Sequence, residues 1–306
     1  MILNSYNQTK LYELDVKFNH LVNLHIQKKL PTKILLSGPK GIGKCTLSYH
    51  LINFILSENE VFSYDLKSLC INKDNKSFKL IQNGSSPNFT LVDVDVEKKN
   101  INILQIRNLI NNLNKSSFNS KPRFILIDNI EFLNINATNA LLKILEEPNK
   151  NIFFILIHNN KKIPTTLLSR CIDFKISMSN DQATNVSNKL LDGNIHDIFN
   201  QDLLNYYSTP GKIYNLVKFS IKNEINLKET NLKEFLLLLI NNMYYKKNSL
   251  YKNILFDFIE IYLIKNISLL YFDHFSYFLK RIENTKKFNL DEESLFIEFK
   301  SKLLNE

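Results

Sequence analysis

A glycine-rich loop constrains the fold of this chain more than any other feature. The stretch KILLSGPKGIGKCTL, residues 33–47, places Gly38, Gly43 and Lys44 in the spacing Gly-x-x-x-x-Gly-Lys, between an apolar run and a helical pattern. Gly41 and Gly43 let the backbone turn so that successive N–H groups point inward, and Lys44 brings a charge to phosphate oxygens. A turn that needs glycine only for its shape is the alternative. The motif predicts a nucleotide-binding α/β domain.

The residue after the lysine departs from the usual pattern of such loops. A hydroxyl there normally binds Mg²⁺, a hard cation that prefers oxygen, whereas this chain has the thiol of Cys45. Thr46 points about 100° further round the helix and cannot simply replace it. We therefore expect nucleotide binding without efficient metal-assisted hydrolysis.

A carboxylate at the end of a second apolar run completes the candidate nucleotide site. Asp128 ends the run RFILID, where a second carboxylate would hold the metal through water. In hydrolysing proteins of this architecture a glutamate usually follows and polarises the attacking water, but here the neighbour is Asn129, which cannot accept a proton. Glu131 is more simply a solvated or helix-capping charge. The candidate cofactor-binding residues are Gly38, Gly41, Gly43, Lys44, Cys45, Thr46 and Asp128.

Short apolar runs alternate with helical patterns over the first part of the chain. The runs lie at residues 33–37, 88–94, 123–128, 151–158 and 172–176. Such alternation predicts an α/β fold in which a parallel sheet is covered by helices on both faces.

Beyond residue 180 the strand patterns stop and amphipathic helical patterns take over. Short helices broken at Gly193 and at 210–211 come first, and longer ones follow after residue 228. One predicted helical face consists of Tyr251, Ile254, Leu255, Phe258, Ile259 and Tyr262. We divide the chain into a nucleotide-binding-like domain, a helical lid and a helical collar domain, at residues 1–177, 178–225 and 226–306.

The stretch LLKILEEPNKNIFFILIHNNKKIPTTLLSRCIDFKI, residues 141–176, carries a specific resemblance. Its LEEP helix end, buried strand and Ser-Arg-Cys triplet around Arg170 resemble the bacterial clamp-loader branch of the AAA+ ATPases. Further similar segments extend the resemblance over residues 10–218. An arginine in a local ion pair is the alternative for Arg170 taken alone.

The resemblance implies a five-stranded AAA+ sheet and a collar through which subunits assemble into a five-membered ring. Arg170 would act in trans as an arginine finger, because a fixed guanidinium stabilises charge growing on a neighbour's γ-phosphate. The partners would be gamma/tau-type and delta-type subunits, the sliding clamp, and primer-template DNA reached through the complex. The loop would either bind ATP without turning it over, with Mg²⁺ undecided, or be vestigial.

Two departures from the family pattern carry expectations of their own. Many members have a four-cysteine zinc module after the loop helix, whereas this region offers only Cys70, so we expect no zinc. Lys212 stands near the position of a nucleotide-sensing arginine in hydrolysing subunits. It would sense nucleotide weakly, or more simply be a solvated lysine at a helix start.

Composition adds a weak indication about partners and compartment. The 306 residues carry a formal net charge of +9, which suits a polyanionic partner but also follows from a bias toward lysine and asparagine. The three cysteines form no Cys-x-x-Cys pair, and no uninterrupted apolar stretch is long enough to span a membrane. We expect a cytoplasmic protein without a membrane partner.

Two other functions fit parts of the sequence. An ATP-hydrolysing motor subunit of the same family would share the glycine loop, but Cys45 and Asn129 argue against it. A small-molecule kinase would need a substrate lid and charges for an acceptor, whereas the chain continues into helices suited to packing on protein.

Overall fold

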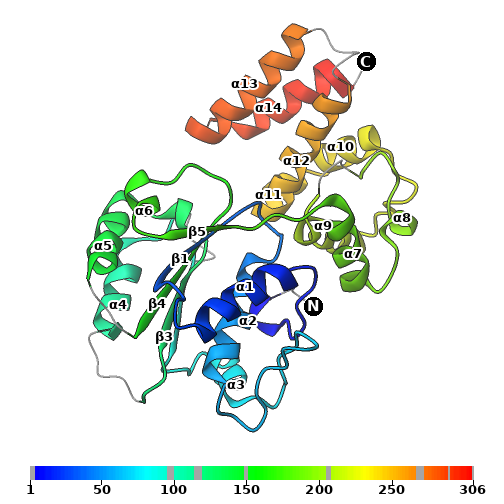
Figure 1. Cartoon of the computed structure of the whole chain (residues 1–306). Coiled ribbons are helices and arrows are strands. Elements are labelled where there is room, and N and C mark those ends of the chain that lie inside the picture. The colour runs from blue at the N-terminus through cyan, green and yellow to red at the C-terminus, as the bar shows by residue number, and fades with distance from the viewer. Residues whose placement is uncertain are drawn as a thin grey trace. The chain divides into compact units, whose positions relative to one another are not determined.

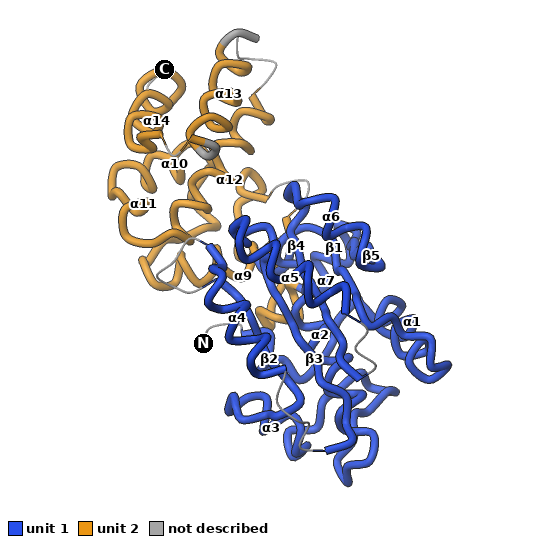
Figure 2. Tube along the Cα trace, turned by 90° about the vertical axis from the view of Figure 1, so that its left-hand side faces the viewer, with its two compact units in different colours: residues 1–186, 209–211 blue, residues 187–208, 212–306 orange. Residues whose placement is uncertain are grey.

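The computed structural model describes residues 4–94, 100–113, 119–147, 151–204, 208–266, 272–288 and 290–304. The chain forms two compact units (Figure 2). The first consists of Met1–Val186 with Thr209–Gly211, and the second of Ser187–Ser208 with Lys212–Glu306.

A five-stranded parallel sheet forms the centre of the first unit (Figure 1). Its strands are β1 Lys33–Ser37, β2 Phe89–Val92, β3 Arg123–Ile127, β4 Ile152–His158 and β5 Ile172–Lys175. They are hydrogen-bonded in the order β2-β3-β4-β1-β5, and every pairing is parallel. The predicted α/β fold and its five strands are confirmed.

Helices cover both faces of this sheet, as the near-continuous apolar strands require (Figure 1). α1 and α2 lie on one face, and α4 and α5 cover the other. The bounds are α1 Asp15–Ile26, α2 Lys44–Leu56, α3 Lys76–Gln82, α4 Ile103–Leu113, α5 Ile135–Glu146 and α6 Thr165–Leu168, with 3-10 turns η1 Ser5–Asn7 and η2 Ile130–Phe132. Buried Leu141 of α5 belongs to the same core as Ile125 and Phe154 of the strands. Because all strands are parallel, their carboxyl ends lie at the same edge of the sheet. The loop between β1 and α2 begins at this edge.

The second unit is entirely helical in its described part. It contains the C-terminal end of α7 Asn180–Leu191 and all but the first two residues of α9 Pro210–Lys222. Its other helices are α8 Ile195–Ile198, α10 Leu232–Asn241, α11 Tyr244–Lys247, α12 Ser249–Lys265, α13 Phe272–Phe288, α14 Glu292–Phe299 and the π-helical turn η3 Lys300–Leu304. The predicted helical face around Phe258 packs into its core. One hydrophobic cluster runs from Ile195 to Leu304, so the boundary predicted between lid and collar at residue 225 stays a prediction.

Asparagine side chains begin several of these helices. Asn134 accepts a hydrogen bond from the backbone of Ala137 at the start of α5, and Asn231 forms a capping box with Glu234 at the start of α10. Such caps satisfy the free N–H groups of a first helical turn and contribute about 1 kcal/mol each. The abundance of asparagine thus has a local structural use.

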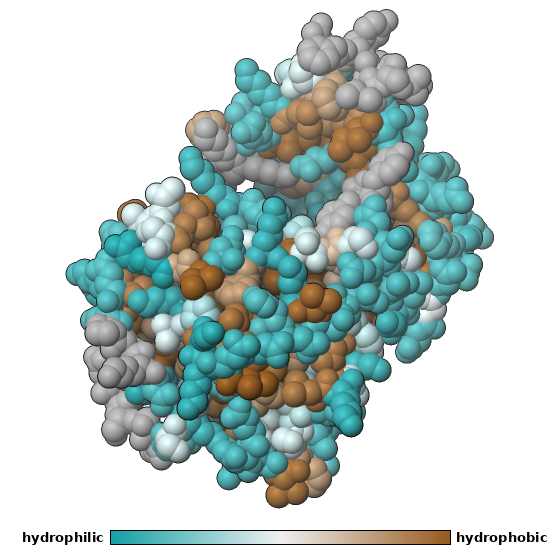
Figure 3. Space-filling model, viewed as in Figure 1, coloured by the Kyte–Doolittle hydropathy of each residue, from teal (hydrophilic) through white to brown (hydrophobic). Residues whose placement is uncertain are grey.

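The described helices include none that is long and apolar enough to cross a lipid bilayer. On the face shown in Figure 3, hydrophobic residues form small patches between hydrophilic ones.

His50 is a buried histidine held in one tautomer. It lies on α2 with no exposed surface; Nε2 is 3.1 Å from the carbonyl oxygen of Gln8, and Nδ1 is 2.8 Å from the hydroxyl of Tyr64. Because a carbonyl only accepts, Nε2 carries the proton and Nδ1 accepts from the tyrosine. Burial lowers the pKa of His50 from 6.5 to about 4.

We predict that His50 makes the protein less stable as pH falls. In the unfolded chain His50 binds a proton below about pH 6.5, whereas in the folded chain it stays neutral down to about pH 4. The free energy of unfolding therefore decreases as pH falls from 6.5 to 4. The loss at the lower end is about 3 kcal/mol. Urea unfolding at pH 7 and pH 4 should show His50→Gln losing less stability than the wild type, with exposed His196→Gln as the control. Equal losses in all three proteins would contradict the prediction.

Candidate functional site

The glycine loop between β1 and α2 adopts a conformation that only glycine takes readily. Gly38, Gly41 and Gly43 have φ values of 152°, 89° and 92°. A Cβ atom on Gly41 would come within 2.5 Å of the hydroxyl oxygen of Thr209. The loop therefore needs glycine both for its backbone and for a close approach by a segment far along the chain.

That segment is Thr209–Gly211, which belongs to the first unit. The Thr209 hydroxyl donates to the carbonyl oxygen of Lys40 at 2.7 Å, and the Gly211 N–H donates to the carbonyl oxygen of Gly41 at 2.9 Å. These two hydrogen bonds hold the glycine loop in place at Lys40 and Gly41.

The side chain of Lys44 stabilises the first part of the loop, at Gly38 and Pro39. It is 4% exposed, and its ammonium donates to the carbonyl oxygens of Gly38 and Pro39 at 2.8 and 2.7 Å and to Oδ1 of Asn159 at 3.0 Å. Burial lowers the pKa of Lys44 to about 8, against the opposing effect of nearby acidic groups, chiefly Asp128. The ammonium therefore lies against the carbonyl groups of the loop, and its role toward phosphate stays a prediction.

The thiol of Cys45 and the carboxylate of Asp128 face each other directly. They share a hydrogen bond, and burial raises the pKa of Cys45 well above its ordinary value, so the thiol is neutral and donates. Burial, and then the charge of Asp93, raise the pKa of Asp128 to about 6. Thr46, the next residue on α2, is partly exposed.

A chain of amide groups continues from Lys44 along the carboxyl ends of the strands. Nδ2 of Asn159, just after β4, donates to Oδ1 of Asn129 at 2.8 Å and to Oε1 of Glu131 at 2.9 Å. Nδ2 of Asn129, just after β3, donates to Oδ1 of Asp93 at 2.8 Å, just after β2. The other carboxylate oxygen of Glu131 is buried and has no hydrogen-bond partner among the described residues.

The sequence analysis did not select Asp93 or give a role to Asn159. Both lie at or just after the end of a predicted apolar run, as Asp128 does, and in the structure each directly follows a strand. Side chains at the carboxyl ends of neighbouring parallel strands meet at one edge. Position after a strand was therefore the signal that could have found them. His158, the last residue of β4, is buried, and its Nδ1 has no partner among the described residues.

The geometry fits phosphate better than it fits magnesium. The positive-φ glycines, the N-terminus of α2 and Lys44 suit the oxygens of a nucleotide's phosphates. Mg²⁺ prefers oxygen ligands. At the position where such loops normally offer it a hydroxyl, this chain has the neutral thiol of Cys45, a soft and weak ligand that is hydrogen-bonded to Asp128. Within the described ranges no cluster of three or more histidine, cysteine, aspartate or glutamate side chains could hold a metal ion.

Arg170 lies apart from these residues, in contacts with its own surroundings. Its Nε donates to Oε1 of Glu146 at 3.0 Å, its Nη2 also bonds Glu146, and its Nη1 donates to the carbonyl oxygen of Thr166 at 2.8 Å. The ion pair is at the surface, with the arginine side chain 32% exposed. The role of Arg170 in trans stays a prediction.

Lys212 forms an ion pair in the second unit. Its ammonium lies 3.0 Å from Oδ2 of Asp257 on α12, and both side chains are more than one third exposed. Cys70, the sole cysteine in the region where many family members carry a zinc module, is a free thiol, as are Cys45 and Cys171.

We predict that Asp128→Asn stabilises the protein above pH 6 and that this gain disappears on acidification. The folded state prefers the protonated carboxyl up to about pH 6, against 3.8 for an ordinary aspartate. The ionised form therefore costs up to about 3 kcal/mol above pH 6, a cost removed as pH falls toward 4. Asparagine keeps an oxygen for the Asn129 N–H, which now donates to Oδ1 of Asp128 at 2.8 Å. Urea unfolding at pH 7.5 and pH 4 measures the effect, and a variant less stable than wild type at pH 7.5 would refute it.

Comparison with known proteins gives one family. The family described as "DNA polymerase III, delta subunit" matches residues 15–180. "DNA polymerase III subunit gamma" of Buchnera aphidicola from Schizaphis graminum is 30% identical over 64% of this chain and 54% of its own length. "DNA polymerase III subunit delta'" of Pseudomonas aeruginosa is 30% identical over 45% of this chain and 40% of its own length. The matched part thus spans about half the length of these relatives or less.

Among solved structures, a gamma-subunit-related protein from Thermotoga maritima covers 90% of this chain and 95% of its own, with 16% identity and a TM-score of 0.45. This similarity is too low to support conclusions. The family match covers more than half of the chain and agrees with the resemblance carried by the glycine loop and the Ser-Arg-Cys triplet. The chain belongs to the DNA polymerase III delta-subunit family, within the AAA+ clamp-loader subunits.

Proposed function

We propose that this chain is a delta-prime-type subunit of the DNA polymerase III clamp loader and does not hydrolyse ATP itself. In the cytoplasm it would join gamma/tau-type and delta-type subunits in a hetero-pentamer that places the sliding clamp on primed DNA. The observation that carries the proposal is the state of Asn129. Its amide is held between Asp93 and Asn159, at the position where a hydrolysing relative needs a proton acceptor.

The loop side of the site supports binding of ATP. The phosphates would be held by the N–H groups of residues 40–44 and by the ammonium of Lys44, while Asn159 orients the lysine. Bound Mg²⁺ would supply charge neutralisation at the phosphates, but the Cys45 and Asp128 pair offers it a poor ligand set. The proposed state is therefore a bound nucleotide that is not turned over.

Arg170 is the residue we assign to catalysis in a neighbouring subunit. Its present ion pair with Glu146 is a surface pair, and such pairs contribute about 0–1 kcal/mol. Arg170 could therefore leave Glu146 and contact a phosphate oxygen at a small cost in free energy. The guanidinium is planar and always charged, which suits it to stabilising charge on a γ-phosphate.

Assembly would use the helical second unit, with residues 178–225 as lid and 226–306 as collar. Several large apolar side chains remain exposed on α13 and α14, including Tyr277 at 44% and Ile297 at 54%. Apolar surface of this kind is suited to packing against other subunits.

We predict that Arg170→Ala leaves the chain folded but removes ATP turnover at the one site that receives it. Loss of an arginine finger lowers phosphoryl-transfer rates about a thousandfold or more at the affected site. The measurement is single-turnover ATP hydrolysis by the loader reconstituted with gamma/tau-type and delta-type subunits. The amount of ATP hydrolysed should fall by the contribution of that one site. Arg170→Lys should not restore it, and exposed Lys17→Ala on α1 serves as the control. Unchanged hydrolysis with Arg170→Ala would remove the finger assignment.

The second candidate is an ATP-hydrolysing gamma/tau-type subunit, favoured by the intact glycine loop and Lys44. The two candidates differ in the turnover of the isolated wild-type chain. We predict none for the wild type, and measurable Mg²⁺-dependent turnover for the double variant Cys45→Thr with Asn129→Glu. Release of phosphate from ATP by each purified protein measures this, and steady turnover by the wild type would favour the motor subunit.

A further inference from the structure

The 3-10 turn η1 packs against the start of α2, beside the candidate nucleotide site. The Ser5 hydroxyl donates a hydrogen bond to the thiol of Cys45, and that thiol donates to the carboxylate of Asp128. The ring of Tyr6 makes an edge contact with the ring of Tyr49, one helical turn further along α2, with the centroids 6.3 Å apart. The turn therefore covers the side of the site at which the thiol and the carboxylate face each other.

Tyr49 gives the turn a fixed surface to lie on. Its side chain is buried, and its ring also packs against Phe89 of β2, with the centroids 5.4 Å apart. Burial, and then the neighbouring groups of Cys45 and Asp128, raise the pKa of Tyr49, so its hydroxyl stays protonated beside them. The surface under the turn is thus a packed part of the first unit and continues directly to the carboxylate of the site.

The chain that follows the turn is held more firmly than the turn itself. The carbonyl oxygen of Gln8 accepts a hydrogen bond from the buried ring of His50 at 3.1 Å, and that of Thr9 accepts a backbone hydrogen bond at 2.8 Å. The turn, in contrast, is held by one hydrogen bond to a thiol, one ring contact and an exposed hydrogen bond from Gln82 to Asn7. Local opening starts where few buried contacts hold the backbone. The turn can therefore leave α2 while the chain from Gln8 onward stays in place.

A magnesium ion would need the space that the turn fills. In glycine loops of this kind the side chain after the lysine faces the metal, and here that side chain is Cys45. Mg²⁺ takes a near-octahedral set of oxygen ligands and usually keeps several waters. The thiol is in contact with Asp128 and with Ser5 of the turn. A hydrated ion therefore reaches this position only after the turn has moved away.

We propose that the η1 turn is a cover that excludes magnesium from the nucleotide site. The proposal rests on the nucleotide binding at the glycine loop proposed above. With the cover closed, the loop N–H groups and Lys44 would still hold the phosphates. A nucleotide that brings its metal has to open the cover first, so its affinity is lowered in proportion to the closed fraction of the protein.

The first test measures the cover in the full chain without any nucleotide. Iodoacetamide alkylates exposed thiols, and peptide mass spectrometry follows each cysteine separately. We expect the double variant Ser5→Ala with Tyr6→Ala to be alkylated at Cys45 about fivefold faster or more, because both contacts of the turn with α2 are removed. The rate at Cys171 should stay unchanged, which excludes a general loosening of the fold.

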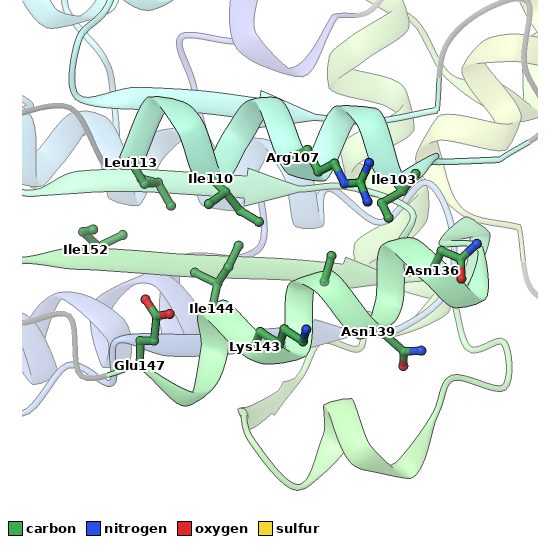
Figure 4. A pocket seen from close by; sticks show the side chains of 11 residues that line it. Ile103, Arg107, Ile110, Leu113, Asn136, Asn139, Lys143, Ile144, Glu147 and Ile152 are labelled. Atoms are coloured by element: carbon green, nitrogen blue, oxygen red, sulfur yellow. The ribbon is translucent and has the colours of Figure 1, made fainter.

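The second test measures competition between the cover and the metal. Fluorescence titration gives the affinity of a methylanthraniloyl derivative of ATP. In Mg²⁺ the double variant should bind about fivefold more tightly than the wild type, whereas in EDTA the two should bind equally. Asn139→Ala is the control, because Asn139 lines a groove of about 510 Å³ between α4 and α5, on the other face of the sheet (Figure 4). This variant should match the wild type in both tests.

The outcomes separate the cover from the proposed nucleotide binding. Unchanged alkylation of Cys45 in the double variant would overturn the cover. Faster alkylation together with an unchanged affinity in Mg²⁺ would overturn its role toward the metal. If no protein of the series bound the nucleotide, this role and the nucleotide binding proposed above would both be wrong, and alkylation would still decide whether the turn covers Cys45.

Discussion

The buried ammonium of Lys44 is the contact on which the rest of the candidate site depends. It joins the carbonyl groups of the glycine loop after β1 to Asn159 at the end of β4. Asn159 continues the connection to Asn129 after β3, and Asn129 continues it to Asp93 after β2. One cation thus ties together the carboxyl ends of four strands. Its lowered pKa shows that holding this charge in the interior costs about 3 kcal/mol at neutral pH.

The network also gives a physical reason for the amide at position 129. Two carboxylates, Asp128 and Glu131, act on the single ammonium of Lys44, and burial, followed by the charge of a third carboxylate, Asp93, raises the pKa of Asp128. A glutamate at position 129 would add a fourth negative charge. Asn129 instead donates to Asp93 and accepts from Asn159, so both ends of its amide are used. The amide thus satisfies both neighbours without placing a further charge beside Asp93 and Asp128.

The sequence predicted the sheet well because its strands are short, apolar and separated by helical patterns. Local pattern was sufficient at β1 and β4, where nearly every position is buried. It was insufficient for the amide network, because Asp93, Asn129 and Asn159 lie in separate loops and meet only through the order of the strands. Local pattern could not predict the contact between Thr209–Gly211 and the glycine loop at Gly41 either, because these residues are far apart in the sequence. Nor could it decide the state of Arg170, whose alternatives differ only in which partner the guanidinium contacts.

The route of the chain between the two units has a practical consequence for dissecting the protein. The backbone leaves the first unit after Val186, returns for Thr209–Gly211, and leaves again. No single cut can therefore release an intact first unit. A fragment that ends at Val186 would keep all five strands but lose the two hydrogen bonds that the returning residues make to Lys40 and Gly41. Measurements of nucleotide affinity on such a fragment would describe a loosened loop and not the loop of the whole protein.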